Sequence, residues 1–200
     1  MGIWTAFKMT IVLTLLTGII YPLAIAGLAG LMFPFQAHGS LIMRDGHVVG
    51  SELIGQNFTS ARYFHGRPSA AGDKGYDASN SGGSNLGPTN RTLIEAVRLR
   101  LRDVIEKNAV NVPARVPIDL VTTSGSGLDP QISPAAADLE VRRVATARGL
   151  SEDTVRALVV AHTSSRWAGV FGEPVVNVLE LNLALDDLVA SVHGGSARNR

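Results

Sequence analysis

Hydrophobic positions are most concentrated near the start of the chain, where residues 9–35 form a run of 27 residues without a charged side chain. A helix needs roughly 20 apolar residues to cross the hydrocarbon core of a bilayer. The run therefore predicts a transmembrane helix over 9–35, preceded by a short N-terminal segment 1–8. Pro22 lies mid-run and lacks a backbone N–H, which predicts a kink. A cleaved signal peptide is the alternative, with Ala24-Ile25-Ala26 as its small-x-small motif, but the apolar residues that follow favour an uncleaved anchor.

Beyond the anchor, short β-forming runs alternate with helical periodicity. Asp45-Gly46, between the runs 41–44 and 47–49, is typical of a β-hairpin turn. Residues 55–88 are rich in Gly, Ser, Asn and Asp and show little periodicity, which is unusual inside a compact domain unless the segment is functional or an interface. The other expected elements are a helix over Thr92–Asn108 capped by Thr89 or Asn90, a strand over 116–121, a helix from Ser133-Pro134 to about Arg148 that Gly149 ends, a helix from Ser151 to about Thr163, a strand over 175–178 and a helix over 179–192.

These elements predict an α+β fold. One N-terminal transmembrane helix is followed by a single mixed α/β extramembrane domain over 36–193, and residues 194–200 are expected to form a flexible tail.

Small residues recur every four positions along the predicted span. Because each four-residue step advances about 40° around a helix, the stripe winds by about 200° over five steps. Close approach at small residues favours helix association in lipid, so the stripe predicts a seam that faces partner helices. The alternative is that such residues are simply common in membrane helices. The stripe consists of Thr10, Thr14, Gly18, Pro22, Ala26 and Gly30.

Charge is low and unevenly placed: 18% of the 200 residues are charged, and Lys8 is the one charged residue before Arg44. Without Lys8 the chain carries 17 basic and 17 acidic residues, and this balance argues against nucleic-acid binding, which needs a basic excess. The positive-inside rule places Lys8 and the N-terminus in the cytoplasm and the domain outside. The absence of cysteine excludes disulfides, Cys-ligated zinc, iron–sulfur clusters and thiol catalysis.

The segment 80–90 has the most distinctive motif, because Gly82 to Thr89 reads G-x-x-x-x-G-P-T before a predicted helix. Pro88 stands where a phosphate-binding loop has its lysine, and it also removes a backbone N–H from the cradle. The leading interpretation is therefore a rigid surface loop that packs on a partner. A looser nucleotide contact at the helix N-terminus is the alternative. Both interpretations rest on Ser81, Gly82, Gly83, Ser84, Asn85, Gly87 and Thr89.

A second candidate segment places an arginine on each side of an aromatic pair. Arg62, Tyr63, Phe64 and Arg67 could form a recognition surface, since Arg and Tyr are common interface anchors. Equally, Tyr63 and Phe64 could fix the long loop to the core. The sequence leaves the two interpretations open.

Hydrolytic and metal chemistry find little support. Gly125-Ser126-Gly127 is not a nucleophile elbow, and nothing in the sequence links His162 or Asp129 to a serine. A turn rich in backbone-bonding hydroxyls is the simpler interpretation. The five histidines do not pair at spacings typical of metal sites, and His162 is expected to be a satisfied core histidine. A membrane-anchored envelope hydrolase is accordingly the least favoured function.

Several stretches together resemble the C subunit of the Kdp potassium-transporting ATPase of bacteria. They run in order from residue 50 to residue 186, and with one N-terminal span and a similar length they cover nearly the whole chain. Val175 departs from the pattern, because the family usually has arginine there, so a charged contact at this position is in doubt. The stretches are 50–56, 63–70, 81–90, 124–130 with 132–133, and 172–174 with 176–179 and 181–182.

The resemblance implies a single-pass inner-membrane subunit without catalytic activity of its own. Its implied partners are a channel-like potassium-translocating subunit, a P-type ATPase subunit, a very small membrane peptide and the lipid bilayer. Family members are described as catalytic chaperones that raise the ATP affinity of the hydrolysing subunit, which makes ATP the one candidate ligand. That role conflicts with a domain outside the cytoplasm, so assembly of the complex or an outer cap over the ion entrance is the leading expectation, and the chaperone role is the alternative.

Overall fold

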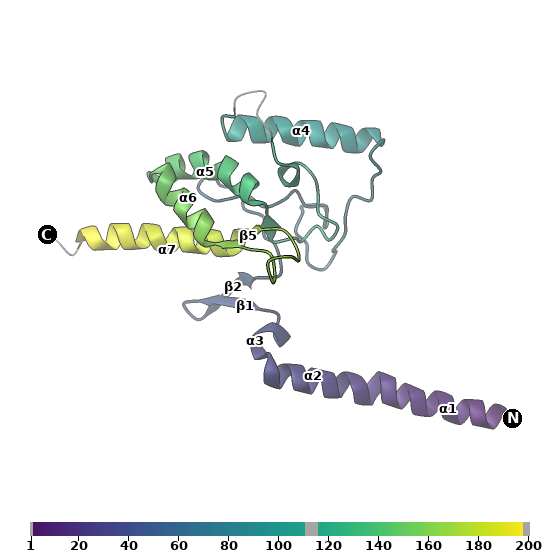
Figure 1. Cartoon of the computed structure of the whole chain (residues 1–200). Coiled ribbons are helices and arrows are strands. Elements are labelled where there is room, and N and C mark those ends of the chain that lie inside the picture. Colours follow the sequence, from purple (N-terminus) through teal and green to yellow (C-terminus); the bar gives the residue numbers. More distant parts are fainter. Residues whose placement is uncertain (1, 111–115, 198–200) are drawn as a thin grey trace. The chain divides into compact units, whose positions relative to one another are not determined.

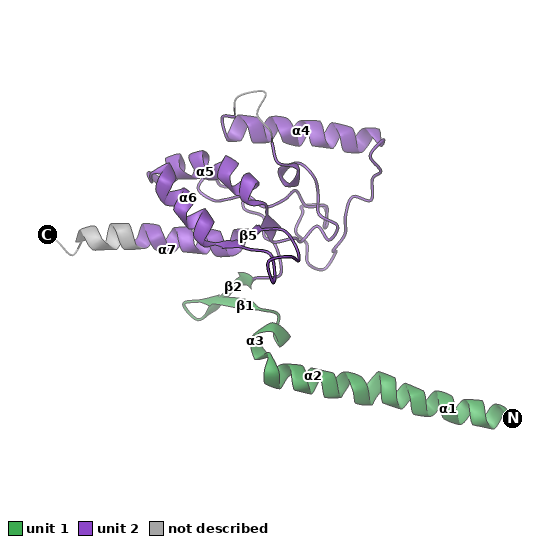
Figure 2. Ribbon diagram, viewed as in Figure 1, with its two compact units in different colours: residues 1–51 green, residues 52–200 purple. Residues whose placement is uncertain are grey.

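The computed structural model describes residues 2–110 and 116–197, and the side chains as far as residue 190. The chain divides into two compact units, residues 1–51 and 52–200 (Figure 2). The mixture of helices and short antiparallel strands confirms the predicted α+β class.

The first unit begins with α1 (Ile3–Leu15), continues through a π-helical turn η1 (Leu16–Ile20) and ends its long apolar helix with α2 (Tyr21–Met32). This stretch of 30 residues is long and apolar enough to cross a membrane, and none of the apolar window is buried. This apolar helix begins and ends earlier than the predicted span 9–35, and the crossing of a membrane stays a prediction. A short α3 (Pro34–Ala37) follows.

Pro22 is accommodated without the predicted kink. The backbone N–H of Tyr21 reaches five residues back to the Leu16 carbonyl oxygen, a π-type bond that widens the turn just before the proline. The wider turn gives room to a ring that would otherwise clash with the carbonyl four residues earlier. As a result, α1 and α2 continue as one rod (Figure 1).

The predicted hairpin is confirmed. Strands β1 (Leu41–Arg44) and β2 (His47–Ser51) pair antiparallel, with Arg44 opposite His47. Asp45 and Gly46 both have positive φ, 52° and 78°, the backbone of the tight turn whose twist matches that of the strands.

In the described part of the second unit, two helices pack on a small sheet, a third packs on those two, and a fourth lies at the edge of the unit (Figure 1). Its sheet has the order β3-β5-β4, antiparallel throughout, with Ile132 opposite Val176 and Thr163 also opposite Val176. The elements are α4 (Arg91–Lys107), the 3₁₀ turn η2 (Ile118–Leu120), β3 (Gln131–Ile132), α5 (Pro134–Arg148), α6 (Glu152–Ala161), β4 (Thr163–Ser164), β5 (Val175–Asn177) and α7 (Val178–Ala197).

The predicted helix starts are confirmed by their caps. The side chains of Asn90, Ser133 and Ser151 each accept a hydrogen bond from a backbone N–H of the first turn that follows. Gly149 ends α5 in the left-handed conformation, with φ 67°, as a C-terminal glycine does.

One expected strand and two expected helix ends differ from the structure. Residues 118–120 form a 3₁₀ turn instead of a strand over 116–121, because Pro117 precedes them and offers no N–H to a ladder. The helix α6 ends at Ala161, since Thr163 joins the sheet beside β5. The last helix continues to Ala197 instead of ending at residue 192, and the flexible tail over 194–200 stays a prediction.

The core lies where α5 and α7 each pack on α6 and on β5. Its largest fully buried side chains include Phe64, which comes from the long loop and not from a helix or strand. By contrast, α4 buries none of its residues. The loop 55–90 is therefore part of the folded core at residue 64, although it contains neither helix nor strand.

Candidate functional site

Polar side chains of α5 and α7 hold the loop segment 61–65 through hydrogen bonds to its backbone. Asn182 uses both ends of its amide: Oδ1 accepts from the Phe64 N–H at 2.8 Å, and Nδ2 donates to the Phe64 carbonyl oxygen at 2.9 Å. Arg143 donates from Nη1 to the carbonyl oxygens of Ala61 and Tyr63, at 2.9 and 2.8 Å. Backbone groups without a strand or helix partner are thus satisfied by buried side chains.

A second arginine, Arg148, completes the support. Its Nε donates to the Arg62 carbonyl oxygen at 2.7 Å, and its Nη1 lies 2.8 Å from an Asp186 carboxylate oxygen. The guanidinium also stacks over the Tyr63 ring at 4.7 Å, while the Tyr63 hydroxyl donates to Asp186. A planar guanidinium can serve these partners together, and a lysine could not.

The four residues proposed as a recognition surface therefore have different roles. Phe64 is fully buried, and Tyr63 is half-buried against Arg148, which is the arrangement of residues that fix the loop. Arg67 pairs with Asp129 at 3.1 Å and donates to the Thr123 carbonyl oxygen. The side chain of Arg62 is exposed, so it is the member of the set best placed for a partner.

Glu140, on α5, lies at the centre of this network with its carboxylate almost fully buried. It accepts the His65 N–H at 2.8 Å and pairs with Arg143 at 3.0 Å. Burial raises the pKa of Glu140 to about 7, although Arg143 and the His65 N–H act in the opposite direction. Burial, with the nearby charge of Arg143, lowers the pKa of His65 to about 4. Nothing in the sequence pattern distinguished Glu140 beforehand, because its position on an inward helix face depends on the packing of α5.

The middle of the loop folds back on the turn 122–130. Ser69 Oγ donates to the Gly127 carbonyl oxygen at 2.6 Å and accepts the N–H groups of Ala71 and Tyr76. The Tyr76 hydroxyl donates to the Arg67 carbonyl oxygen at 2.5 Å, and burial raises the pKa of Tyr76 to about 12. A polar loop is thereby held without secondary structure.

The predicted nucleotide or partner loop docks on the same turn through its first half. The Gly82 N–H and the Ser81 hydroxyl both donate to the Ser126 carbonyl oxygen, at 2.9 and 3.0 Å. A Cβ atom at Gly83 would lie 3.0 Å from the Gly125 carbonyl oxygen. Further along, Ser84 is half-buried, whereas Asn85, Gly87 and Thr89 are exposed, and Asn85 has a left-handed φ of 52°.

A cavity that the sequence did not reveal lies between the loop 57–76, α4 and α5, with a volume of about 400 Å³. Its wall carries charges of both signs, including the cations of Lys74, Arg100 and Lys107 and the carboxylates of Asp73 and Asp103. Lys107 pairs with Asp103 at 2.8 Å, and Arg100 donates to the Val121 carbonyl oxygen. The positions of its lining residues depend on how the loop folds over α4, so spacing in the sequence gave no signal.

The described residues contain no arrangement of side chains that supports the hydrolase or the metal-site interpretation. The Asp129 carboxylate bonds to Arg67 and the Gln131 N–H, and the half-buried His162 ring bonds to the Leu158 carbonyl oxygen. Among the described residues, no group of three or more histidine or acidic side chains converges as a metal site would require.

The small-residue stripe of the first unit lies on the exposed apolar helix. Thr10 donates its hydroxyl to the Ala6 carbonyl oxygen, which satisfies it within the helix. The π turn takes roughly one residue more than an α turn, so it subtracts about 100° from the expected winding of about 200°. The stripe is therefore straighter than the sequence alone predicts.

Comparison with known proteins identifies one family. The family model described as "K+-transporting ATPase, c chain" matches residues 3–187. A potassium-transporting ATPase KdpC subunit of Gemmatimonas aurantiaca is 61% identical over 186 residues, covering 93% of this chain and 92% of that protein. A KdpC subunit of Rhodopseudomonas palustris strain BisB18 is 58% identical over 192 residues, covering 90% of this chain and 95% of that protein. One from Koribacter versatilis is 53% identical, covering 91% and 92%.

Proposed function

Because this chain belongs to the family of K⁺-transporting ATPase C chains, we propose that it is a non-catalytic accessory subunit of an ATP-driven potassium uptake pump. It assembles or stabilises the complex and covers the ion entrance from outside. Its proposed partners are a channel-like potassium-translocating subunit, a P-type ATPase subunit, a small membrane peptide and the lipid bilayer that its N-terminal helix crosses.

The proposal rests on the hydrogen-bond partners of the polar side chains in the long loop. Ser69, Ser81 and Arg67 of the loop bond to backbone carbonyl oxygens of the same unit. Arg143 of α5 in turn bonds to a carbonyl oxygen of the loop. A catalytic centre needs a nucleophile, a base or a metal aimed at open space, whereas these groups hold a shaped surface. A rigid surface of this kind suits a subunit that acts by binding.

The nucleotide-binding chaperone is the alternative, and the geometry of the loop 81–89 weakens it. Phosphate cradles present free backbone N–H groups at a helix N-terminus. Here the Gly82 N–H is bonded to Ser126, the Thr92 N–H is bonded to the Asn90 side chain, and Pro88 has no N–H. These three positions therefore offer no free N–H group to a phosphate.

Charge supports the proposed orientation, with the N-terminus in the cytoplasm and the second unit on the outer side of the inner membrane. Lys8 lies near the N-terminal end of the apolar helix, and Arg44 is the first charged residue after it. Cations are retained on the cytoplasmic side of a span. In this orientation the second unit has no access to cytoplasmic ATP.

Purification of the full chain from native membranes in mild detergent tests the accessory role. We expect larger membrane subunits, identified by mass spectrometry, to co-purify in fixed ratio with this chain. Recovery of the chain alone, from membranes in which a potassium-dependent ATPase is active, would contradict the proposal.

Nucleotide titration separates the two functions. The purified chain should neither bind ATP at millimolar concentration nor hydrolyse it. ATP binding that disappears in Ser84→Ala or Asn85→Ala, and is retained in Arg62→Ala, would favour the chaperone alternative instead.

A further inference from the structure

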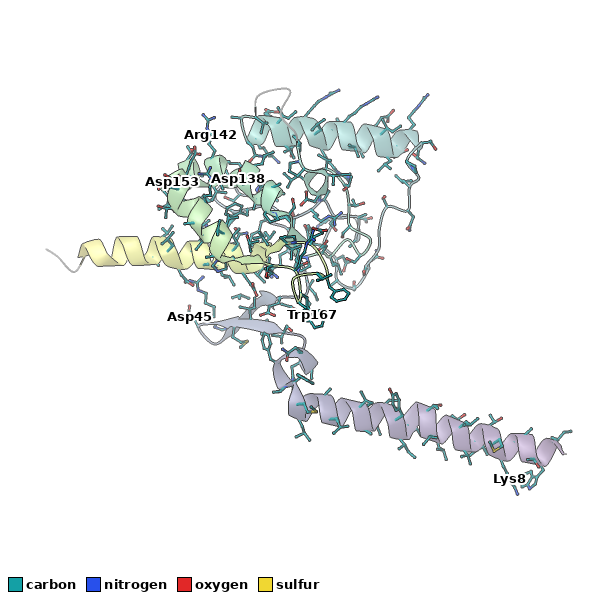
Figure 3. The ribbon with its side chains drawn as sticks, viewed as in Figure 1. Lys8, Asp45, Asp138, Arg142, Asp153 and Trp167 are labelled. Atoms are coloured by element: carbon teal, nitrogen blue, oxygen red, sulfur yellow. The ribbon has the colours of Figure 1, made fainter. Side chains whose placement is uncertain are left out.

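The connection between β4 and β5 ends in an apolar tip, which we call the 167–172 tip after its sequence Trp-Ala-Gly-Val-Phe-Gly. Its three large side chains are among the most exposed apolar groups of the second unit: Trp167 is 75% exposed, Val170 72% and Phe171 64%. Figure 3 shows Trp167 at the periphery of that unit. Contiguous exposed apolar groups of this kind mark an interaction site.

The tip is a built structure and not a loose loop. Trp167 and Phe171 exchange two backbone hydrogen bonds, of 2.8 and 3.0 Å, and their rings pack with centroids 5.7 Å apart. Ala168 and Gly169 adopt left-handed φ values of 50° and 76° to close the turn. Arg166 and Glu173 pair at 2.7 Å across its base, so the charges beside the tip neutralise each other.

We propose that the 167–172 tip inserts into the interfacial layer of the lipid bilayer that the N-terminal helix crosses. Tryptophan is the side chain most typical of that layer, because its ring is apolar and its N–H can still meet water or a headgroup. The tip contains no charged side chain, and the indole N–H is its one polar side-chain group.

The backbone of the tip also suits lipid. Unsatisfied N–H groups are costly in an apolar medium. The N–H groups of Gly169 and Val170 bond to the carbonyl oxygens of Arg166 and Trp167, in addition to the two bonds between Trp167 and Phe171. Four of the five N–H groups from Trp167 to Phe171 are therefore satisfied inside the hairpin. A protein-binding loop has no need of this, since a partner can supply acceptors.

The position of the tip within the second unit fits as well. This unit begins at Glu52, and the Glu52 carbonyl oxygen accepts from Asn177 Nδ2 at 2.8 Å. Asn177 ends β5, whose first residue, Val175, pairs with Ser164 at the base of the hairpin. The point where the chain joins this unit and the base of the hairpin are thus separated by two residues of strand, about 7 Å.

The same chain keeps the unit near the bilayer. The apolar helix ends at Met32 and the second unit begins at Glu52, and a chain of that length reaches at most about 70 Å when fully extended. Tethering of this kind raises the effective concentration of the lipid surface, so a small apolar tip is enough for insertion.

The chain offers a direct measurement, because Trp4 and Trp167 are its two tryptophans. Trp4→Phe leaves Trp167 as the single tryptophan in the full chain, which is reconstituted in vesicles of lipids brominated at carbons 6 and 7 and excited at the red edge of the absorption band, where tyrosine does not absorb. A ring held about 5–10 Å into the headgroup and acyl boundary contacts these bromines, so its emission should fall about two-fold relative to unbrominated vesicles. Iodide in the buffer should quench it less than it quenches free tryptophan.

Matched variants place the effect at the tip. In the Trp4→Phe background, Phe171→Asp should abolish quenching by brominated lipid and restore quenching by iodide. Val160→Asp, which places the same charge on an exposed apolar position of α6 (69% exposed), should leave both unchanged.

Two results would overturn the proposal. One is full access of iodide to Trp167 in vesicles, with no quenching by brominated lipid. The other is protection from iodide that appears only in the assembled pump and again without quenching by brominated lipid, which would make the tip a contact with another subunit. Neither result depends on which side of the membrane the unit occupies when iodide is present on both sides of the vesicles, because both leaflets carry the bromine label.

Discussion

Asn182 shows how one buried amide fixes a loop that lies 118 residues away in sequence. Its side chain is 1% exposed, and both of its polar ends are used by the backbone of Phe64. Arg143 and Arg148 act in the same way on residues 61–63. At this scale the second unit is stabilised by side chains that replace the backbone partners a strand would have supplied.

Replacing Asn182→Leu should lower the free energy of unfolding by about 2–4 kcal/mol, because it leaves a buried N–H and a buried carbonyl without partners. Denaturant unfolding of the full chain in mild detergent measures this. The same substitution at the exposed Asn80 should change the free energy by less than about 0.5 kcal/mol. Equal effects of the two substitutions would show that the amide does not hold the loop.

Glu140 and His65 have opposing effects on the pH dependence of stability. Glu140 has a raised pKa of about 7 against 4.5, so the folded state holds its extra proton and stability falls as the pH rises from 4.5 to 7. His65 has a lowered pKa of about 4 against 6.5, so the unfolded state holds the extra proton and stability rises as the pH rises from 4 to 6.5. In the shared window the two effects cancel.

Glu140→Gln should therefore remove the opposing effect and leave the pH dependence that His65 gives to stability. Between pH 4.5 and 6.5 the stability of this variant should rise with pH by up to about 1.4 kcal/mol per pH unit relative to the unchanged chain. Denaturant midpoints at a series of pH values measure the slope, and Glu95→Gln, at an exposed position on α4, should leave it unchanged. Parallel pH profiles for Glu140→Gln and the unchanged chain would contradict the assignment.

At the scale of elements, the polar loops act as one layer because they meet at glycines. Gly127 has a φ of 67°, and a Cβ atom there would lie 2.6 Å from the Gly82 carbonyl oxygen and 2.8 Å from the Ala71 nitrogen. The segments 69–72, 81–83 and 124–128 all meet at this position. The loop with the distinctive motif is thus part of a packed arrangement.

Gly127→Ala should destabilise the second unit by about 3 kcal/mol, because it combines a left-handed backbone with backbone clashes. Gly87→Ala, in the same motif but with no atom within 4 Å of the added carbon, should stay within about 0.5 kcal/mol. Thermal unfolding compares the two. Destabilisation by Gly87→Ala of the same size would mean that the second half of the loop is also packed.

The apolar helix carries a prediction of its own, because its stripe is straightened by the π turn. Gly18→Leu or Gly30→Leu should reduce co-purification of the pump subunits, since a bulky side chain prevents close approach of helices. A Cβ atom at Gly18 would have its nearest neighbour at 4.0 Å, and one at Gly30 would meet nothing within 4 Å, so the helix itself tolerates both. Leu16→Ala, off the stripe, is the control, and equal retention of partners by all three variants would assign the association to the second unit alone.

On the scale of the whole molecule, the chain consists of a first unit that contains an exposed apolar helix of 30 residues and a second, folded unit from Glu52 onward. All the acidic residues and all the basic residues except Lys8 follow this helix in the sequence. The orientation of this charged part of the chain decides between an outer cap and an ATP-related role.

A topology reporter tests that orientation. A reporter that is active only outside the cytoplasm, fused after Arg200, should be active, because Lys8 holds the N-terminus inside. A reporter that works only in the cytoplasm should be silent at the same site. The reverse pattern would contradict the outer-cap proposal and restore the chaperone alternative.

Local physics explains what the sequence by itself determined about this protein. The apolar run, the Asp45-Gly46 turn and the caps at Asn90, Ser133, Ser151 and Gly149 depend on neighbours within a few residues, and each is present in the structure. The ordered motifs likewise identified the family.

Tertiary structure alone decided the roles of Tyr63, Phe64 and Glu140, the docking of the loop 81–83 and the shape of the cavity beside α4. Their partners lie tens of residues away or more, on α5, α7 and the turn 122–130. No periodicity encodes such contacts, because burial of a polar group depends on which distant partner satisfies it. Whether Tyr63 and Phe64 fix the loop or recognise a partner was therefore open in the sequence. In the structure Phe64 is buried in the core and Tyr63 packs against Arg148, which favours the first interpretation.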